Sequence, residues 1–269
     1  MAEELAGGYN TAPIREGNTV VRSTGTWSVN VHALLRHFEN AGFAQAPRFI
    51  SADHEAGTET LSYIAGQPGT YPLTAPQRSD EALTHVAATI RAMHDATTGF
   101  TAPEPGNWQY RTTIPVDIDC IGHNDLGPYN TVYDGTKATA IIDWDFAGPS
   151  NRLWDLCYAA HRFVPLSAPR STKAFGWDPM PDQAKRLRLF TDTYGHCIKP
   201  VGLLDLLIVR LASIAANIEK QIRLGNPKFN RQRDERHTDG YREDMCYILS
   251  NHQNLRGETY TKMKPSSSP

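Results

Sequence analysis

A predicted β-hairpin with polar residues at its open end places the strongest constraint on this chain. Residues 130–142 hold two strand-like runs around Asp134-Gly135, which is a strong turn signal. In the register that this turn predicts, Asn130 faces Ile141, and Asp143 lies diagonally about 7–8 Å from Asn130 across the ladder. An amide and a carboxylate in this arrangement can bind one hard cation between their oxygens.

Asp125 lies shortly before Asn130, in a loop that Gly127 and Pro128 make irregular, so its carboxylate can turn toward the same cleft. Alone, Asp125 would be interpreted as a loop residue that caps a turn. Together with Asn130 and Asp143 it supplies a free base beside a metal site. This combination suits phosphoryl transfer, in which positioning and charge neutralisation provide most of the catalysis.

The composition excludes several other classes of protein. With 269 residues the chain can form one large domain or two lobes, and its formal charge of −2 gives no bulk attraction to nucleic acid or to a membrane surface. The four cysteines lack a short metal-binding spacing and are expected to be buried thiols in a reducing compartment. The N-terminus lacks the regions of a signal peptide, so we expect a soluble cytoplasmic protein.

The remaining patterns predict a β-rich part followed by a helical part. A hairpin over residues 13–22 comes first, and the segment 65–69 has the composition of a linker. Residues 203–224 carry an amphipathic stripe interrupted by charges, which favours a core helix over a membrane span. The other expected helices are 28–41, 79–95, 151–164 and 182–194, and the other expected strands of the first part are 47–51 and 59–64.

The polar cluster has the residue types and spacing of a known family. His123-x-Asp125-Leu126-x-x-x-Asn130 is followed by a hairpin, by Ile141-Ile142-Asp143-Trp144-Asp145 and by Trp154-Asp155-Leu156. In order and spacing this resembles the aminoglycoside phosphotransferases and their relatives, which share the protein kinase fold. We therefore expect an α+β, protein-kinase-like two-lobed fold. It would comprise a reduced N-terminal β lobe (1–65), a larger, mainly helical C-terminal lobe (66–256) and a flexible tail (257–269).

The resemblance implies a role for each polar residue. Asp125 would orient the substrate hydroxyl and accept its proton, while Asn130 and Asp143 would hold the Mg²⁺ ions that bridge the phosphates of ATP or GTP. Asp145 would be a supporting carboxylate near the metals, and a solvent-facing carboxylate is an equal alternative. Asp155 would brace the catalytic loop through hydrogen bonds.

Weaker matches extend over roughly residues 15–250. Tyr63 and Ile64 look like the hinge whose backbone receives the adenine edge, and Met93-His94 resembles the end of the helix before the catalytic loop. His123 is expected to be structural, packing and hydrogen-bonding within the loop rather than acting as an acid or a ligand.

The N-terminal lobe departs from the family pattern. Only 21 residues precede Arg22, and Gly7-Gly8 is a poor substitute for a Gly-rich loop that covers the phosphates. Arg22 stands where the family presents a phosphate-binding lysine, and the following helix offers His32 where it should carry a glutamate partner. We expect Arg22 to bind phosphate with a shape and reach of its own, an ordinary edge charge being the alternative.

These observations favour transfer of the terminal phosphate of ATP or GTP to a hydroxyl of a small molecule. The departures favour one alternative, a catalytically impaired kinase-like binding or regulatory protein. Magnesium-dependent hydrolysis would explain the carboxylates but not the hinge-like segment. Acceptor and oligomeric state are not predicted.

The basic run at residues 223–237 is expected to be a solvated face. If it lined the acceptor cleft, it would favour a neutral or anionic acceptor over an aminoglycoside.

Overall fold

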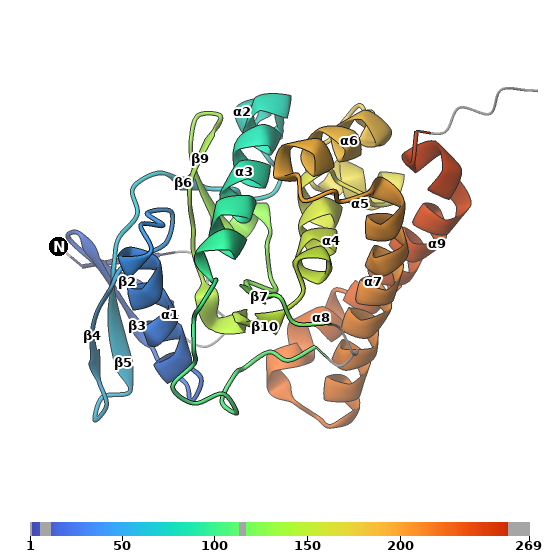
Figure 1. The fold of residues 1–269 in the computed structure, drawn as a ribbon. Coiled ribbons are helices and arrows are strands. Elements are labelled where there is room, and N and C mark those ends of the chain that lie inside the picture. The colour runs from blue at the N-terminus through green and yellow to red at the C-terminus, as the bar shows by residue number, and fades with distance from the viewer. Residues whose placement is uncertain (1, 6–11, 113–116, 258–269) are drawn as a thin grey trace, which may run out of the picture.

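The protein is described by a computed structural model over residues 2–5, 12–112 and 117–257. A small antiparallel sheet with one helix forms one lobe, and a larger lobe is mainly helical (Figure 1). The sheet has the strand order β1-β2-β3-β5-β4. Its elements are β1 (Ala2–Glu4), β2 (Ile14–Glu16), β3 (Thr19–Ser23), α1 (Ser28–Asn40), β4 (Phe49–Asp53) and β5 (Thr58–Ser62).

The first hairpin is present where the sequence predicts it. β2 and β3 pair with Arg15 opposite Val20, around a turn that contains Gly17 at φ 63°. A further strand, β1, pairs with β2 on the outer side, so the small lobe has two strands before β3. The connection between β1 and β2 includes Gly7-Gly8, which lies outside the described residues. The expectation about the phosphate cover therefore stays a prediction.

A three-stranded sheet of β6 (Gln67–Pro68), β8 (Thr131–Asp134) and β9 (Lys137–Ile141) carries the hairpin beside the loop that contains Asp125, which is the expected catalytic loop. The predicted register is wrong by one residue at its open end, because Thr131 rather than Asn130 is opposite Ile141. The reason is an irregularity in the ladder, which skips Thr139 between the pairs Val132–Ala140 and Tyr133–Ala138. The Asn130 carbonyl instead accepts from the Ile142 N–H at 2.9 Å, so Asp143 still follows directly.

The larger lobe is built mainly from helices. α7 lies between α4 and α9 and packs against both, while α3 packs against α6 and β9 (Figure 1). Its elements are α2 (Ala75–Arg78), α3 (Asp80–Ala96), β7 (Cys120–Gly122), η1 (Pro128–Asn130), η2 (Trp144–Phe146), β10 (Gly148–Ser150), α4 (Arg152–Phe163), α5 (Pro169–Ala174), α6 (Gln183–Tyr194), α7 (Pro200–Arg223), η3 (Pro227–Phe229), α8 (Asn230–Asp234) and α9 (His237–Leu255). The five predicted helices are all present within a few residues of their expected ends.

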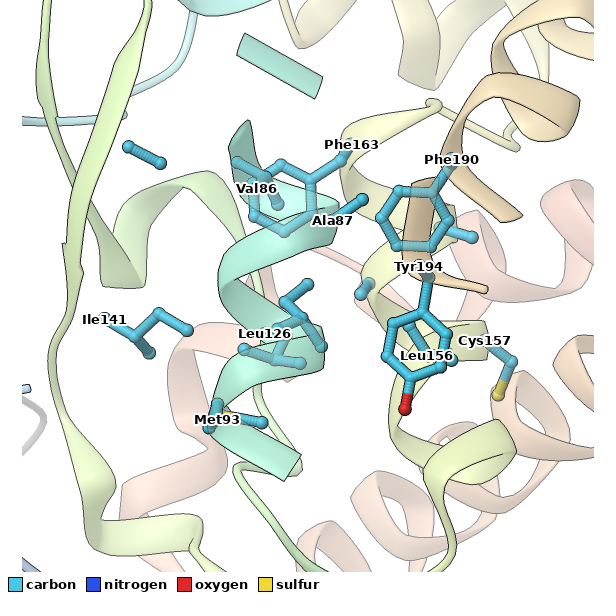
Figure 2. Close-up of a cluster of buried hydrophobic side chains, with 14 of the residues drawn as sticks. Val86, Ala87, Met93, Leu126, Ile141, Leu156, Cys157, Phe163, Phe190 and Tyr194 are labelled. Atoms are coloured by element: carbon cyan, nitrogen blue, oxygen red, sulfur yellow. The ribbon is translucent and has the colours of Figure 1, made fainter. Parts of the chain in front are cut away.

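One continuous hydrophobic core runs from α1 through the hairpin into the helical lobe. Figure 2 shows Leu126, the residue after Asp125, inserted among Met93 of α3, Ile141 of β9 and Leu156 of α4. Leu126 has no exposed surface. Full burial of a leucine side chain contributes about 1.5–3 kcal/mol, so the core fixes the position of the loop that carries Asp125.

Two expectations about buried residues have different outcomes. Cys120 and Cys157 are buried as predicted, but Cys197 and Cys246 are exposed, because one lies in the loop after α6 and the other on the outer face of α9.

Among the described residues α7 is the one helix long and apolar enough to span a bilayer, and it passes that test by length and composition only. Most of the predicted apolar stripe on α7, from Leu204 to Ile218, faces the core. Residues 258–269 of the expected tail lie outside the described residues, and the division at residue 65 stays a prediction.

Candidate active site

The catalytic loop joins β7 to η1 and presents Asp125 in a partly buried position. Asp125 Oδ1 accepts from the Tyr129 hydroxyl at 2.7 Å, and Asp125 Oδ2 accepts from Asn130 Nδ2 at 3.1 Å. Asn130 Nδ2 also donates to the Asp125 carbonyl, which fixes the orientation of the amide. Burial, opposed mainly by the Tyr129 hydrogen bond, raises the pKa of Asp125 to about 6.

Asp155 lies under this loop with no exposed surface. Its carboxylate accepts from the backbone N–H groups of His123 at 2.8 Å and Asn124 at 2.7 Å, and it contacts His94 Nε2 at 3.1 Å. Asn124 has φ 63°, a left-handed conformation that costs free energy unless its surroundings fix it. These are the hydrogen bonds that the expected bracing role of Asp155 requires.

His123 connects the catalytic loop to the loop that follows the hairpin. Its Nε2 lies 3.0 Å from the Ile142 carbonyl and its Nδ1 lies 3.3 Å from the Asp125 N–H. Since Nδ1 accepts, the proton resides on Nε2, and both ring nitrogens are used within the protein. The ring also packs against Trp144, with centroids 4.9 Å apart. The structural role expected for His123 stays a prediction.

Asp143 and Asp145 flank Trp144, whose indole is buried and donates to the Ile141 carbonyl at 3.0 Å. Asp143 has φ 62°, so the chain turns sharply there, and both carboxylates reach the guanidinium of Arg22 in the small lobe. Arg22 Nη1 lies 3.1 Å from Asp143 Oδ1, and Arg22 Nη2 lies 2.7 Å from Asp145 Oδ1. Burial raises the pKa of Asp145 above its usual value, although Arg22 opposes this effect.

Glu59 is a site residue that the sequence analysis missed. It lies opposite Arg22 in the β3–β5 ladder and is almost fully buried. Its Oε1 accepts from Arg22 Nε at 2.5 Å, and its Oε2 is hydrogen-bonded to His32 of α1. Arg22 therefore has a glutamate partner after all, supplied by β5 instead of the helix. The spacing held a signal, because Glu59 lies on the same strand face as the buried Leu61 and so had to be paired.

The predicted hinge residues lie at the end of β5. The Tyr63 N–H donates to the Asn18 carbonyl at 2.8 Å and is not free to receive a ligand. Arg15 stacks on the Tyr63 ring, 3.8 Å from its centroid. Within the described ranges, the Tyr63 carbonyl and the N–H and C=O of Ile64 make no hydrogen bond. These backbone groups are the ones left to bind an adenine edge.

The expected metal ligands suit a hard cation in their chemistry. Asn130 uses its Nδ2 within the loop, so its Oδ1 is left without a hydrogen bond in the described part of the chain, and nearly half of the Asp143 side chain is exposed. Both supply the oxygen ligands that Mg²⁺ prefers. Residues 2–5, 12–112 and 117–257 contain no cluster of three or more His, Cys, Asp or Glu side chains that could hold a metal. A metal here would depend on the amide, on few carboxylates and on the phosphates of a nucleotide.

The loop of Asp125 and Asn130, the carboxylates of Asp143 and Asp145, and an arginine on the third strand of a small sheet have the arrangement of a kinase-like phosphotransferase. The model of the phosphotransferase enzyme family matches residues 113–187, which include every site residue from His123 to Asp155. The chain belongs to this family. Trifolitoxin immunity protein from Rhizobium leguminosarum bv. trifolii is 34% identical over 224 residues, covering 81% of this chain and 83% of that protein.

Solved structures confirm the kinase-like fold. A choline/ethanolamine kinase family protein from Mesorhizobium loti has a TM-score of 0.61 at 17% identity, covering 96% of this chain and 92% of its own. Amicoumacin kinase hAmiN has a TM-score of 0.62 at 12% identity, covering 91% and 88%. A GDP complex of aminoglycoside 2'-phosphotransferase-IIIa has a TM-score of 0.59 at 12% identity, covering 91% and 92%. At these identities the likeness concerns the fold alone.

Proposed function

We propose that this protein transfers the terminal phosphate of ATP or GTP to a hydroxyl of a small molecule. The observation that carries the proposal is the set of contacts at the junction of the two lobes. Asp125 and Asn130 are hydrogen-bonded to each other on one loop, and Arg22 reaches both carboxylates of the next loop. Membership of the phosphotransferase family supports the class of reaction.

Asp125 positions the acceptor hydroxyl and takes its proton. With a pKa of about 6 it is mostly ionised at neutral pH and still basic enough to accept a proton. Asn130 and Asp143 would hold Mg²⁺, which neutralises charge on the nucleotide phosphates. Arg22 keeps one nitrogen on Glu59 while its other two are exchangeable between carboxylates and phosphate oxygens. The Tyr63 carbonyl and the backbone N–H and C=O of Ile64 offer hydrogen-bonding groups for the purine base of the nucleotide.

Labelled nucleotide tests this proposal directly. The protein is incubated with γ-labelled ATP or GTP and Mg²⁺, with and without hydroxyl compounds, and products are separated. Label on an acceptor supports phosphotransfer. Label released as free phosphate at the same rate with every compound would support hydrolysis instead. We further propose that the protein works in the cytoplasm, where ATP and GTP are available.

A binding protein without turnover is the second candidate. It is favoured by Arg22, which already pairs with both Asp143 and Asp145, and by a relative whose name describes immunity to a toxin. Thermal shift with Mg-ATP, Mg-GTP and Mg²⁺ alone separates the candidates, since a ligand that binds the native state raises its apparent stability. A protein that shifts with no nucleotide is not the proposed phosphotransferase, and one that shifts with a nucleotide but transfers no label to any compound is a binding protein without turnover.

A further inference from the structure

A chain of hydroxyl groups leads from Asp125 to a guanidinium in the helical lobe. The Tyr129 hydroxyl donates to Asp125 and lies 3.0 Å from the Tyr158 hydroxyl. Because Tyr129 donates to the carboxylate, Tyr158 must donate to Tyr129. Arg162 Nε and Nη2 in turn donate to the Tyr158 oxygen at 3.1 and 2.9 Å. Every donor in the chain therefore points from Arg162 toward the proposed base.

Arg162 forms no ion pair with an acidic side chain of the described residues. Its hydrogen bonds go to the hydroxyls of Tyr158 and Tyr241, and no carboxylate of the described residues lies within ion-pair distance. Its guanidinium carbon lies 5.1, 5.5 and 5.9 Å from the ring centroids of Tyr158, Phe175 and Tyr241. A partly buried cation held only by neutral groups retains its attraction for an anion.

A second buried cation contacts the same tyrosine. Arg210 is 2% exposed, and its guanidinium carbon lies 5.7 Å from the Tyr158 ring centroid. Its Nη2 donates to the carbonyl of Asn124, next to Asp125, at 2.8 Å. Its Nε and Nη1 are buried without a hydrogen-bond partner anywhere in the described ranges. Burial lowers the pKa of Arg210 to about 9, which leaves it charged at neutral pH.

Tyr71 adds another buried hydroxyl to this cluster. Its ring stacks on Phe175 with centroids 4.6 Å apart and lies edge-on to Tyr129 at 6.4 Å. Its hydroxyl is buried beside the guanidinium of Arg162. Burial raises the pKa of Tyr71 to about 12, so the hydroxyl keeps its proton and can donate.

The basic run at residues 223–237 is separate from the two cations of this cluster, Arg162 and Arg210. Arg231, Arg233 and Arg236 are exposed and pair with neighbouring acids, namely Glu235, Asp234 and Asp239. These three arginines of the run are thus solvated and paired. Arg162 and Arg210, in contrast, form no ion pair with a carboxylate of the described residues, and both lie beside the catalytic loop.

A ring of aromatic side chains often binds a cationic ligand through their faces. Here Arg162 occupies that position, so a cationic acceptor would meet a like charge. We propose that the acceptor carries an anionic group, a carboxylate or a phosphate, which binds Arg162 while its hydroxyl lies at Asp125. The inference rests on the proposed phosphotransfer and names the substrate class of the same site.

The test uses a diverse set of hydroxyl compounds, each as a carboxylate, a phosphate ester, a neutral amide and an amine. The glycerol and hydroxyphenyl series are included. Calorimetry without nucleotide measures binding, and γ-labelled ATP or GTP with Mg²⁺ measures transfer. The variants are Arg162→Gln and Arg162→Lys. Arg152→Gln is the matched control, because Arg152 starts the same helix, about 15 Å away at 1.5 Å per residue, and pairs with Asp95.

We expect acids or phosphate esters to bind and to accept label at least tenfold better than their amides and amines. Arg162→Gln should remove that preference by raising KM, Arg162→Lys should restore part of it, and Arg152→Gln should leave it unchanged. Whichever of the carboxylate and phosphate-ester series binds better identifies the anionic group of the acceptor. Anion binding that depends on Arg162 without transfer retains the inference and removes the proposed function. A preference for amines or amides, or binding of no anion, overturns the inference even if transfer occurs.

Discussion

Glu59 lies directly opposite Arg22 in the β3–β5 ladder and accepts a hydrogen bond from Arg22 Nε at 2.5 Å. The same guanidinium reaches Asp143 and Asp145 with its other two nitrogens. One side chain thus connects the small sheet to the loop that carries the proposed metal ligands. His32 contacts the far oxygen of Glu59, so the helix α1 takes part in the same network.

Replacing Arg22 should change the affinity for Mg²⁺ and the affinity for nucleotide in opposite directions. Arg22→Gln removes the positive charge that neutralises Asp143 and Asp145, and a charge contact at about 4 Å is worth about 1 kcal/mol in water. We therefore expect binding of Mg²⁺ alone to tighten roughly fivefold, and binding of Mg-ATP or Mg-GTP to weaken because a phosphate contact is lost. Calorimetry on each ligand measures both changes.

Arg48→Gln serves as the control for that experiment. Arg48 is also an arginine of the small lobe, but it lies on the surface and pairs with Glu39. It should change neither affinity. If Arg22→Gln weakened the binding of Mg²⁺ and of nucleotide equally, Arg22 would stabilise the structure of the site and would not compete with the metal.

Glu59 should make stability depend on acid pH. Burial opposes its ionisation, but the hydrogen bonds and charges of His32 and Arg22 prevail and lower its pKa below the usual value of 4.5. A lowered folded-state pKa gives stability that is present above the unfolded pKa and is lost as pH falls through the folded pKa. Melting temperatures between pH 3 and 7 should fall more steeply below about 4.5 for the wild type than for Glu59→Gln. Parallel curves would contradict this role.

Asp155→Asn should loosen the catalytic loop. The carboxylate accepts two backbone N–H groups, and an amide that places its NH₂ toward one of them leaves a buried donor unpaired. We expect a loss of about 3 kcal/mol in the free energy of unfolding. Hydrogen exchange at His123 and Asn124 should accelerate more than at core amides. Asp205→Asn, at an exposed position paired with His252, is the control and should change neither quantity.

The sequence predicted elements whose signals are local. The apolar spacing of α3 and α7 and the turn at Asp134-Gly135 were sufficient for those helices and that hairpin. The predicted strand register is wrong from Thr139 onward. An irregularity in the ladder depends on packing on both faces of the hairpin and leaves no pattern in the sequence of one strand.

The site was easiest to predict where its residues follow one another closely along the chain. The segment from His123 to Asp155 has fixed spacings that identify it. Arg162 and Arg210 look like ordinary helix charges in the sequence, and their contacts arise only when α4 and α7 pack beside the catalytic loop. Glu59 similarly meets Arg22 through strand pairing across 37 residues.

The rate of label transfer by Asp125→Asn tests the central claim most directly. Asp134→Asn, an exposed aspartate in the nearby hairpin turn, is the matched control. A general base typically contributes about 10²–10⁴-fold. We therefore predict that Asp125→Asn lowers transfer from labelled nucleotide at least about a hundredfold while nucleotide affinity stays close to that of the wild type. Transfer by Asp125→Asn at nearly the wild-type rate would contradict the account and remove Asp125 from the mechanism.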